Sequence, residues 1–124
     1  GIPQQDDWQP LIDAWLTHKP SLTHQIFLKA KAEQLDLTLL AWIMGRNLQV
    51  AYALHTTHDN PSTIYQQYKV WPKLIPIIES WAKRISKETL IEALKNIQEA
   101  DIFIKSGQTY KAWHFIEKTL LCTI

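Results

Sequence analysis

The sequence predicts an all-α fold, a single compact domain of six or seven helices. Apolar residues recur at steps of three and four through most of the chain, as on one face of a helix. Nowhere do four or more residues alternate with β-branched enrichment, as half-buried strands would. With 124 residues, 46% apolar and 20% charged, the chain is long enough for one buried core. No period of 20 to 50 residues is evident, which argues against a solenoid.

The first predicted helix is short and ends before a proline. Asp6 or Asp7 is expected to cap its N-terminus. Its apolar face follows the i, i+3, i+4, i+7, i+8 pattern and consists of Trp8, Leu11, Ile12, Trp15 and Leu16. The helix should end near His18, because a residue that precedes proline is disfavoured in the helical region, and Pro20 follows closely.

A second helix is expected from about Pro20 to Glu33. The residues predicted to share its buried face are Leu22, Ile26 and Ala30. Asp36 can cap a third helix that reaches about Thr56. This third segment is apolar nearly all round, which predicts burial on several sides. Gly45 lies in its interior, where it costs about 1 kcal/mol relative to Ala, and we expect a neighbouring helix to approach it closely.

Residues 57–61 form the clearest loop. Asn60 and Pro61 are typical of the N-cap and first residue of a short helix. Its aromatic and apolar residues are Ile64, Tyr65 and Tyr68. Residues 70–72 open a fifth helix, and Pro76 must lie in its first turn or kink it. Its inward face is predicted to hold Leu74, Ile78, Trp81, Ala82 and Ile85.

The strongest helix signal runs from Ser86 to Gly107. Ser86 can cap the first turn, Glu88 suits the positive end of the helix dipole, and Gly107 can adopt the left-handed conformation that ends a helix. One face carries Leu90, Leu94, Ile97, Asp101 and Ile104. A carboxylate on an apolar face needs a partner, so we predict a structural ion pair between Asp101 and Lys105, at i+4.

The last helix should begin at Gln108 or Thr109, with Tyr110, Trp113, Ile116 and Leu120 facing inward. Cys122 in its apolar tail is the single cysteine, so an internal disulfide is excluded and a reducing, cytoplasmic location is expected. No apolar run is long enough to span a membrane, and no leader-like segment is present. Because the chain begins with Gly1 rather than Met, we expect it to be a fragment of a longer protein.

No constellation of residues predicts an enzyme. His55, His58 and Asp59 lie at a helix end without the further ligands that a zinc site requires. The remaining histidines are isolated in the sequence, at positions 18, 24 and 114. Carboxylates are scattered, and no glycine-rich phosphate-binding motif occurs. We therefore expect no catalytic, metal-binding or cofactor-binding residues and no cofactor.

Charge leaves nucleic-acid binding open as an alternative function. The net charge is +1, but residues 61–124 carry nine Lys/Arg against six Asp/Glu. Basic and aromatic side chains that could form such a surface are Lys69, Lys73, Lys83, Arg84, Lys87 and Lys111, with Tyr65, Tyr68 and Trp71. Against this hypothesis, residues 61–84 contain three prolines, Pro61, Pro72 and Pro76, and the basic residues there do not fall on one helical face.

The second half of the chain resembles a known family. Val70–Trp71 precedes a helix ending in WAKRIS, then L-x-x-A-L-x-x-I-x-x-A-D-x-x-I-K-S-G, then A-W-x-x-I-E-x-x-L-L-C. This order resembles the C-terminal end of the delta subunit of bacterial DNA polymerase III, part of the sliding-clamp loader. The first half has the family's succession of short, second and long apolar helices, although HQIFLKAKAEQLD is a looser match. The resemblance covers about residues 7–122.

The resemblance implies an assembly role in DNA replication. In that family the helical C-terminal domain joins those of the gamma/tau and delta prime subunits in a pentameric collar. In that family an AAA+-like N-terminal part, outside these residues, grips the sliding clamp, and ATP hydrolysis belongs to gamma/tau. This fragment is therefore not expected to be an enzyme, although the parent holoenzyme is a DNA polymerase. We expect exposed aromatic side chains to make the collar contacts, with Tyr65, Tyr68, Trp71 and Trp81 as candidates.

Overall fold

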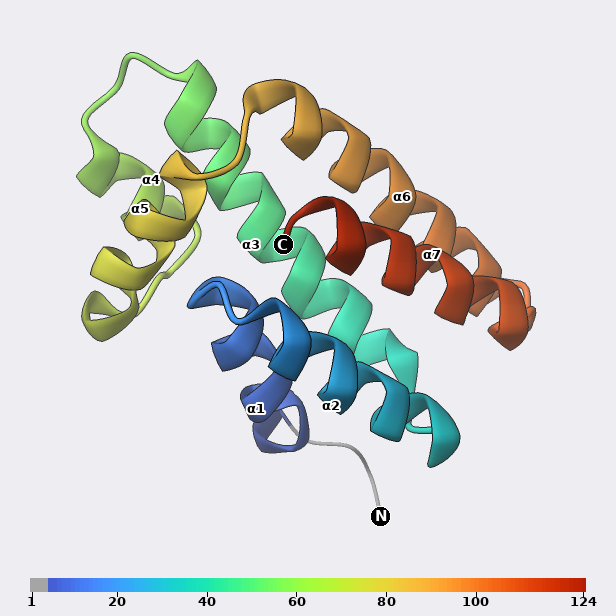
Figure 1. Ribbon diagram of the computed structural model, residues 1–124. Helices are drawn as coiled ribbons and strands as arrows, with labels where there is room; N and C mark the ends of the chain where they lie inside the picture. Colours follow the sequence, from blue (N-terminus) through green and yellow to red (C-terminus); the bar gives the residue numbers. More distant parts are fainter. Residues whose placement is uncertain (1–4) are drawn as a thin grey trace.

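The computed structural model describes residues 5–124, with side chains from Trp8 onward, and confirms the all-α prediction (Figure 1). The described residues form seven α-helices and one 3₁₀ turn, without a strand. In chain order these are α1 (Gln5–Leu16), α2 (Pro20–Ala32), α3 (Leu37–Thr56), α4 (Pro61–Gln67), η1 (Pro72–Leu74), α5 (Ile75–Lys83), α6 (Lys87–Lys105) and α7 (Thr109–Cys122). None of the described helices combines the length and apolar character needed to cross a bilayer.

Helix α3 is the centre of the fold. It packs against α1, α4, α5, α6 and α7, and Figure 1 shows it running between the α1–α2 pair and the α6–α7 pair. Eight of its 20 residues are buried: Leu37, Leu40, Ala41, Ile43, Met44, Leu48, Val50 and Ala51. This confirms the burial on several sides that its apolar sequence predicts.

Side-chain caps fix several helix starts as predicted. The backbone N–H of Thr38 donates to Asp36 Oδ1 at 2.8 Å at the start of α3. Ser62 N–H donates to Asn60 Oδ1 at 3.0 Å before α4. These bonds satisfy N–H groups that have no partner inside the helix. The prediction for α1 is wrong, because that helix already begins at Gln5 and both Asp6 and Asp7 lie inside it.

Helices α6 and α7 form a tightly packed hairpin. Ser86 Oγ accepts from Thr89 N–H at 3.1 Å at the start of α6. At its end Gly107 has φ +74°, and the N–H of Gln108 bonds to Phe103 O at 2.8 Å, which is a Schellman ending. Small residues let the two helices approach, and Ala93, Ala100 and Ala112 are fully buried. The α6 core face therefore includes alanines that the predicted stripe omitted.

The core joins the two ends of the chain. Trp15 on α1 and Trp81 on α5 lie edge to face with ring centroids 4.7 Å apart, and both are buried. The indole N–H of Trp15 donates to Thr123 Oγ1 at 2.8 Å, just past α7. Aromatic packing of this kind adds about 0.5–1.5 kcal/mol beyond the area it buries.

Two residues predicted to face inward, Leu22 and Tyr110, are exposed. Leu22 is 44% exposed because α2 turns Thr23 and Phe27 into the core instead, whereas Ile26 is partly buried and packs against the core. Phe27 lies edge to face with Trp113, at 5.6 Å between centroids. Tyr110, in the first turn of α7, is 83% exposed.

Candidate interaction surface

Two exposed tryptophans, each beside a cation, mark one side of the molecule. Trp42 on α3 is 58% exposed, and Trp71, just before η1, is 62% exposed. The Arg46 guanidinium lies 5.5 Å from the Trp42 ring centroid, one helical turn further along α3. Lys73 Nζ lies 5.4 Å from the centroid of Trp71. Such cation–π contacts contribute about 0.5–1 kcal/mol at exposed sites, and they hold the cations on the surface next to flat apolar groups.

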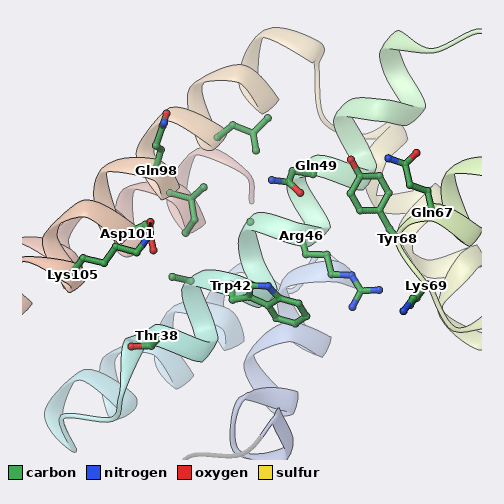
Figure 2. Close-up of a pocket in the computed structure, with 14 residues that line it drawn as sticks. Thr38, Trp42, Arg46, Gln49, Gln67, Tyr68, Lys69, Gln98, Asp101 and Lys105 are labelled. Atoms are coloured by element: carbon green, nitrogen blue, oxygen red, sulfur yellow. Dashed lines mark ion pairs between the residues drawn. The ribbon is translucent and has the colours of Figure 1, made fainter.

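A first groove lies between α3 and α6 and has a volume of about 960 Å³. Figure 2 shows Trp42, Arg46, Tyr68 and Lys69 on one side of it and the α6 residues on the other. Its lining is Thr38, Ala41, Trp42, Gly45, Arg46 and Gln49 from α3, Gln67, Tyr68 and Lys69 from the end of α4, and Leu94, Ile97, Gln98, Asp101 and Lys105 from α6. Amide, hydroxyl and charged groups therefore surround an apolar floor.

A second groove, of about 540 Å³, lies between α1, α3 and η1. Trp42, Arg46 and Lys69 line both grooves and so form the ridge between them. Its walls also include Trp71 and Lys73 and the aliphatic residues Ile12, Leu16, Ile43, Val50, Val70, Leu74, Ile77 and Ile78. The exposed tryptophans thus border continuous concave surface, as expected of a site that receives a partner.

The four predicted interface residues have different environments. Trp71 is exposed, and Tyr68 is half-buried in the lining of the first groove. Trp81 is 1% exposed and Tyr65 6%, so the expectation that these two are exposed aromatics is wrong. Trp81 is covered because its face of α5 packs on α1. Neither side chain can contact a partner unless the domain unfolds.

Tyr65 has a structural role that the sequence did not suggest. Its hydroxyl donates to Glu79 Oε1 at 2.7 Å, which ties α4 to α5. Burial, and then the adjacent Glu79 carboxylate, raise the pKa of Tyr65 far above its ordinary value. The phenol therefore keeps its proton at neutral pH and can donate this hydrogen bond.

The Asp101–Lys105 pair forms as predicted, but at the surface. Lys105 Nζ lies 2.7 Å from Asp101 Oδ2, and the two side chains are 74% and 51% exposed, respectively. Asp101 lines the first groove rather than an apolar interface inside the domain. An exposed i, i+4 pair is worth about 0.3–0.5 kcal/mol, too little to fix the helix register.

Two histidine side chains form hydrogen bonds between helices, and the cysteine is partly buried. His24 Nε2 lies 3.0 Å from Glu117 Oε2, between α2 and α7, and His55 Nε2 lies 2.7 Å from the carbonyl of Ala82. Burial raises the pKa of the Cys122 thiol, which disfavours the reactive thiolate. From Trp8 onward, no three His, Cys, Asp or Glu side chains gather closely enough to hold a metal ion.

The basic residues considered for nucleic acid do not form one patch. Lys69 and Lys73 border the second groove. Lys87 begins α6, whereas Lys111 lies in the first turn of α7, beyond the other end of that helix. A helix of 19 residues is about 28 Å long, so these two lysines lie far apart.

Trp42 and Arg46 are the site residues that sequence reasoning missed. They lie in a segment that is apolar nearly all round, so Trp42 was indistinguishable from its buried neighbours. The available signal was the i, i+4 spacing of a tryptophan and an arginine, which places both on one face of a helix.

Comparison of the chain with protein families, with curated proteins and with solved structures finds no match.

Proposed function

We propose that this chain is a non-catalytic assembly module, the collar domain of a delta subunit of the bacterial DNA polymerase III clamp loader. The observation that supports it is how the family-like motifs fall on the helices. WAKRIS runs from the last turn of α5 to Ser86, the N-cap of α6. The L-x-x-A-L to K-S-G pattern runs from Leu90 in α6 to Gly107, and A-W-x-x-I-E-x-x-L-L-C covers α7 from Ala112 to Cys122. The motifs thus follow the succession of α5, α6 and α7 along the chain.

The surface supports a role in binding other proteins. Protein interfaces are enriched in tryptophan, tyrosine and arginine, and anchors of these types carry most of the binding energy. Trp42, Trp71, Arg46 and Tyr68 meet around the two grooves. In the proposed assembly the partners are the gamma/tau and delta prime subunits. The domain would hold its subunit in place within the loader. ATP hydrolysis belongs to gamma/tau, and clamp gripping belongs to a region outside these 124 residues.

The test is a mass measurement by light scattering across a concentration series, with the chain alone and with the cognate gamma/tau and delta prime collar domains. We expect a defined hetero-complex whose affinity changes little between low and high salt, because apolar anchors dominate. Absence of any complex at concentrations where the partners assemble with one another would refute the assembly role.

Contact with single-stranded nucleic acid is the second candidate, favoured by the two tryptophan–cation pairs. Bases stack on exposed tryptophans, and nearby lysine and arginine bind phosphates. Binding of oligo(dT) that weakens steeply with salt would support this function, since phosphate contacts release counterions. The scattering of the other basic residues limits such a site to the surface around Trp42 and Trp71.

A further inference from the structure

Gly45 is unexplained by packing within the domain. It lies in the middle of α3, where glycine costs about 1 kcal/mol relative to alanine. A close helix neighbour was the expected reason for it. The nearest atom to a Cβ built at Gly45 is Ile97 Cγ2 at 4.0 Å, an ordinary van der Waals distance. The domain itself would accept a side chain here, so its own helices do not require the glycine.

The space above Gly45 is the first groove. Gly45 and Ala41, one turn earlier, line it together, so α3 presents little side-chain bulk along this part of its surface. Leu94 and Ile97 of α6 provide apolar contacts beside them. Helix axes approach to about 8–10 Å depending on the size of the residues between them, and small residues allow the closest approach. The floor of the groove therefore has the form that a packed helix requires.

The length and polar groups of the groove also suit a helix. Along α3 the lining extends from Thr38 to Gln49, a span of about 17 Å or three helical turns. Gln49, Gln67 and Gln98 supply amides at its edges. An amphipathic helix in a groove buries its apolar face and leaves its polar flanks to such groups.

The charges around the groove favour an acidic occupant. Asp101 and Lys105 neutralise each other on the α6 side of the groove. Arg46 and Lys69 line its other side, and neither belongs to an ion pair with any of the carboxylates whose side chains are described. A partner with a carboxylate beside these two cations would complement them, whereas a basic partner would be repelled.

We propose that the α3–α6 groove receives a helix of a neighbouring collar-type subunit, packed over Ala41 and Gly45 with an acidic side chain beside Arg46 and Lys69. This inference rests on the proposed assembly function and assigns it a specific surface. The glycine then has a physical reason: its missing side chain makes room for the partner rather than for this domain.

The test fills the groove without disturbing the core. Gly45→Leu places a side chain into space that the domain leaves open, and Gln98→Trp narrows the groove from an exposed position on α6. Ala32→Leu, exposed at the end of α2 and outside the groove lining, is the matched control. Circular dichroism and urea unfolding establish that each variant is folded. Light scattering and titration with the gamma/tau and delta prime collar domains then measure affinity.

We expect both groove variants to lose about tenfold or more in affinity for the collar partners, and the Ala32→Leu control to bind as the unsubstituted chain does. Unchanged affinity of folded Gly45→Leu and Gln98→Trp would overturn the inference while leaving the assembly role intact. Loss of oligo(dT) binding with unchanged partner binding would also overturn it, and would assign the groove to nucleic acid. If the unsubstituted chain binds no collar partner, the proposed function itself fails and the inference with it.

Discussion

Trp15 and Thr123 join the first helix of the domain to the last residues of the chain. The indole Nε1 donates to Thr123 Oγ1 at 2.8 Å, and both side chains are buried. The same hydroxyl donates in turn to the backbone carbonyl of Thr119 at 2.8 Å. Segments separated by 108 positions are thereby fixed to each other, so the α6–α7 hairpin and α1 should unfold together.

Thr123→Val is expected to destabilise the domain by about 1–3 kcal/mol. Valine has a similar shape but cannot accept a hydrogen bond, so the buried indole N–H of Trp15 would be left without a partner. Thr123→Ser keeps the hydroxyl and is the control, with a loss of about 1 kcal/mol or less expected for one methyl group. Urea unfolding followed by tryptophan fluorescence measures the difference. Equal stability of the valine and serine variants would show that this hydrogen bond contributes nothing.

Two glycines should respond to alanine with opposite signs. Gly45→Ala is expected to stabilise the domain by about 0.5–1 kcal/mol, because the helix accommodates the methyl group and the unfolded chain loses freedom. Gly107→Ala should destabilise it by about 1 kcal/mol, because φ is +74° at this position. The melting temperatures of the two variants, compared with that of the unsubstituted chain in thermal unfolding, test both signs. A destabilised Gly45→Ala would mean that the α3–α6 contact is tighter than the 4.0 Å distance indicates.

Helix boundaries were the most predictable part of the fold because they depend on local chemistry. Asp36, Asn60 and Ser86 cap helices from their own sequence position, and Gly107 ends α6 through its own backbone conformation. Neither feature needs information from distant residues. That is why the segmentation into helices could be predicted from the sequence.

Helix faces were less predictable because distant packing decides them. Helix α2 has apolar residues on two sides, and it buries Phe27 because Trp113 is available to pack against it. Thr23 can be buried beside it because its hydroxyl donates to the carbonyl of Lys19 at 2.7 Å. The grooves depend on the same tertiary information, since they combine α3 with η1, α4 and α6.

Burial of the Tyr65 phenol, together with its hydrogen bond to Glu79, should make stability depend on pH in the alkaline range. The pKa of Tyr65 is raised on folding, so the folded state holds its proton more tightly than the unfolded state does. Its contribution is fully present below the unfolded pKa of about 10, and it declines as the pH rises above that value. Tyr65→Phe lacks this dependence. We expect the stability advantage of the unsubstituted chain over Tyr65→Phe to shrink above about pH 10 in urea unfolding at a series of pH values, and a constant difference would contradict the assignment.

Alanine substitution of Trp81 should reduce stability, whereas alanine substitution of Trp71 should reduce only partner binding. Trp81→Ala removes a side chain that is 1% exposed and packs on Trp15, so a loss of about 3–5 kcal/mol in unfolding free energy is expected. Trp71 is 62% exposed, and Trp71→Ala should change stability by about 0.5 kcal/mol or less. If Trp71 contacts a collar partner, its alanine variant should nevertheless weaken hetero-complex formation by about tenfold, as truncation of an interface anchor does. Urea unfolding and light scattering on the same samples give the two quantities. Unfolding of Trp71→Ala would place this tryptophan in the core, and normal assembly of a folded Trp71→Ala would remove it from the interface.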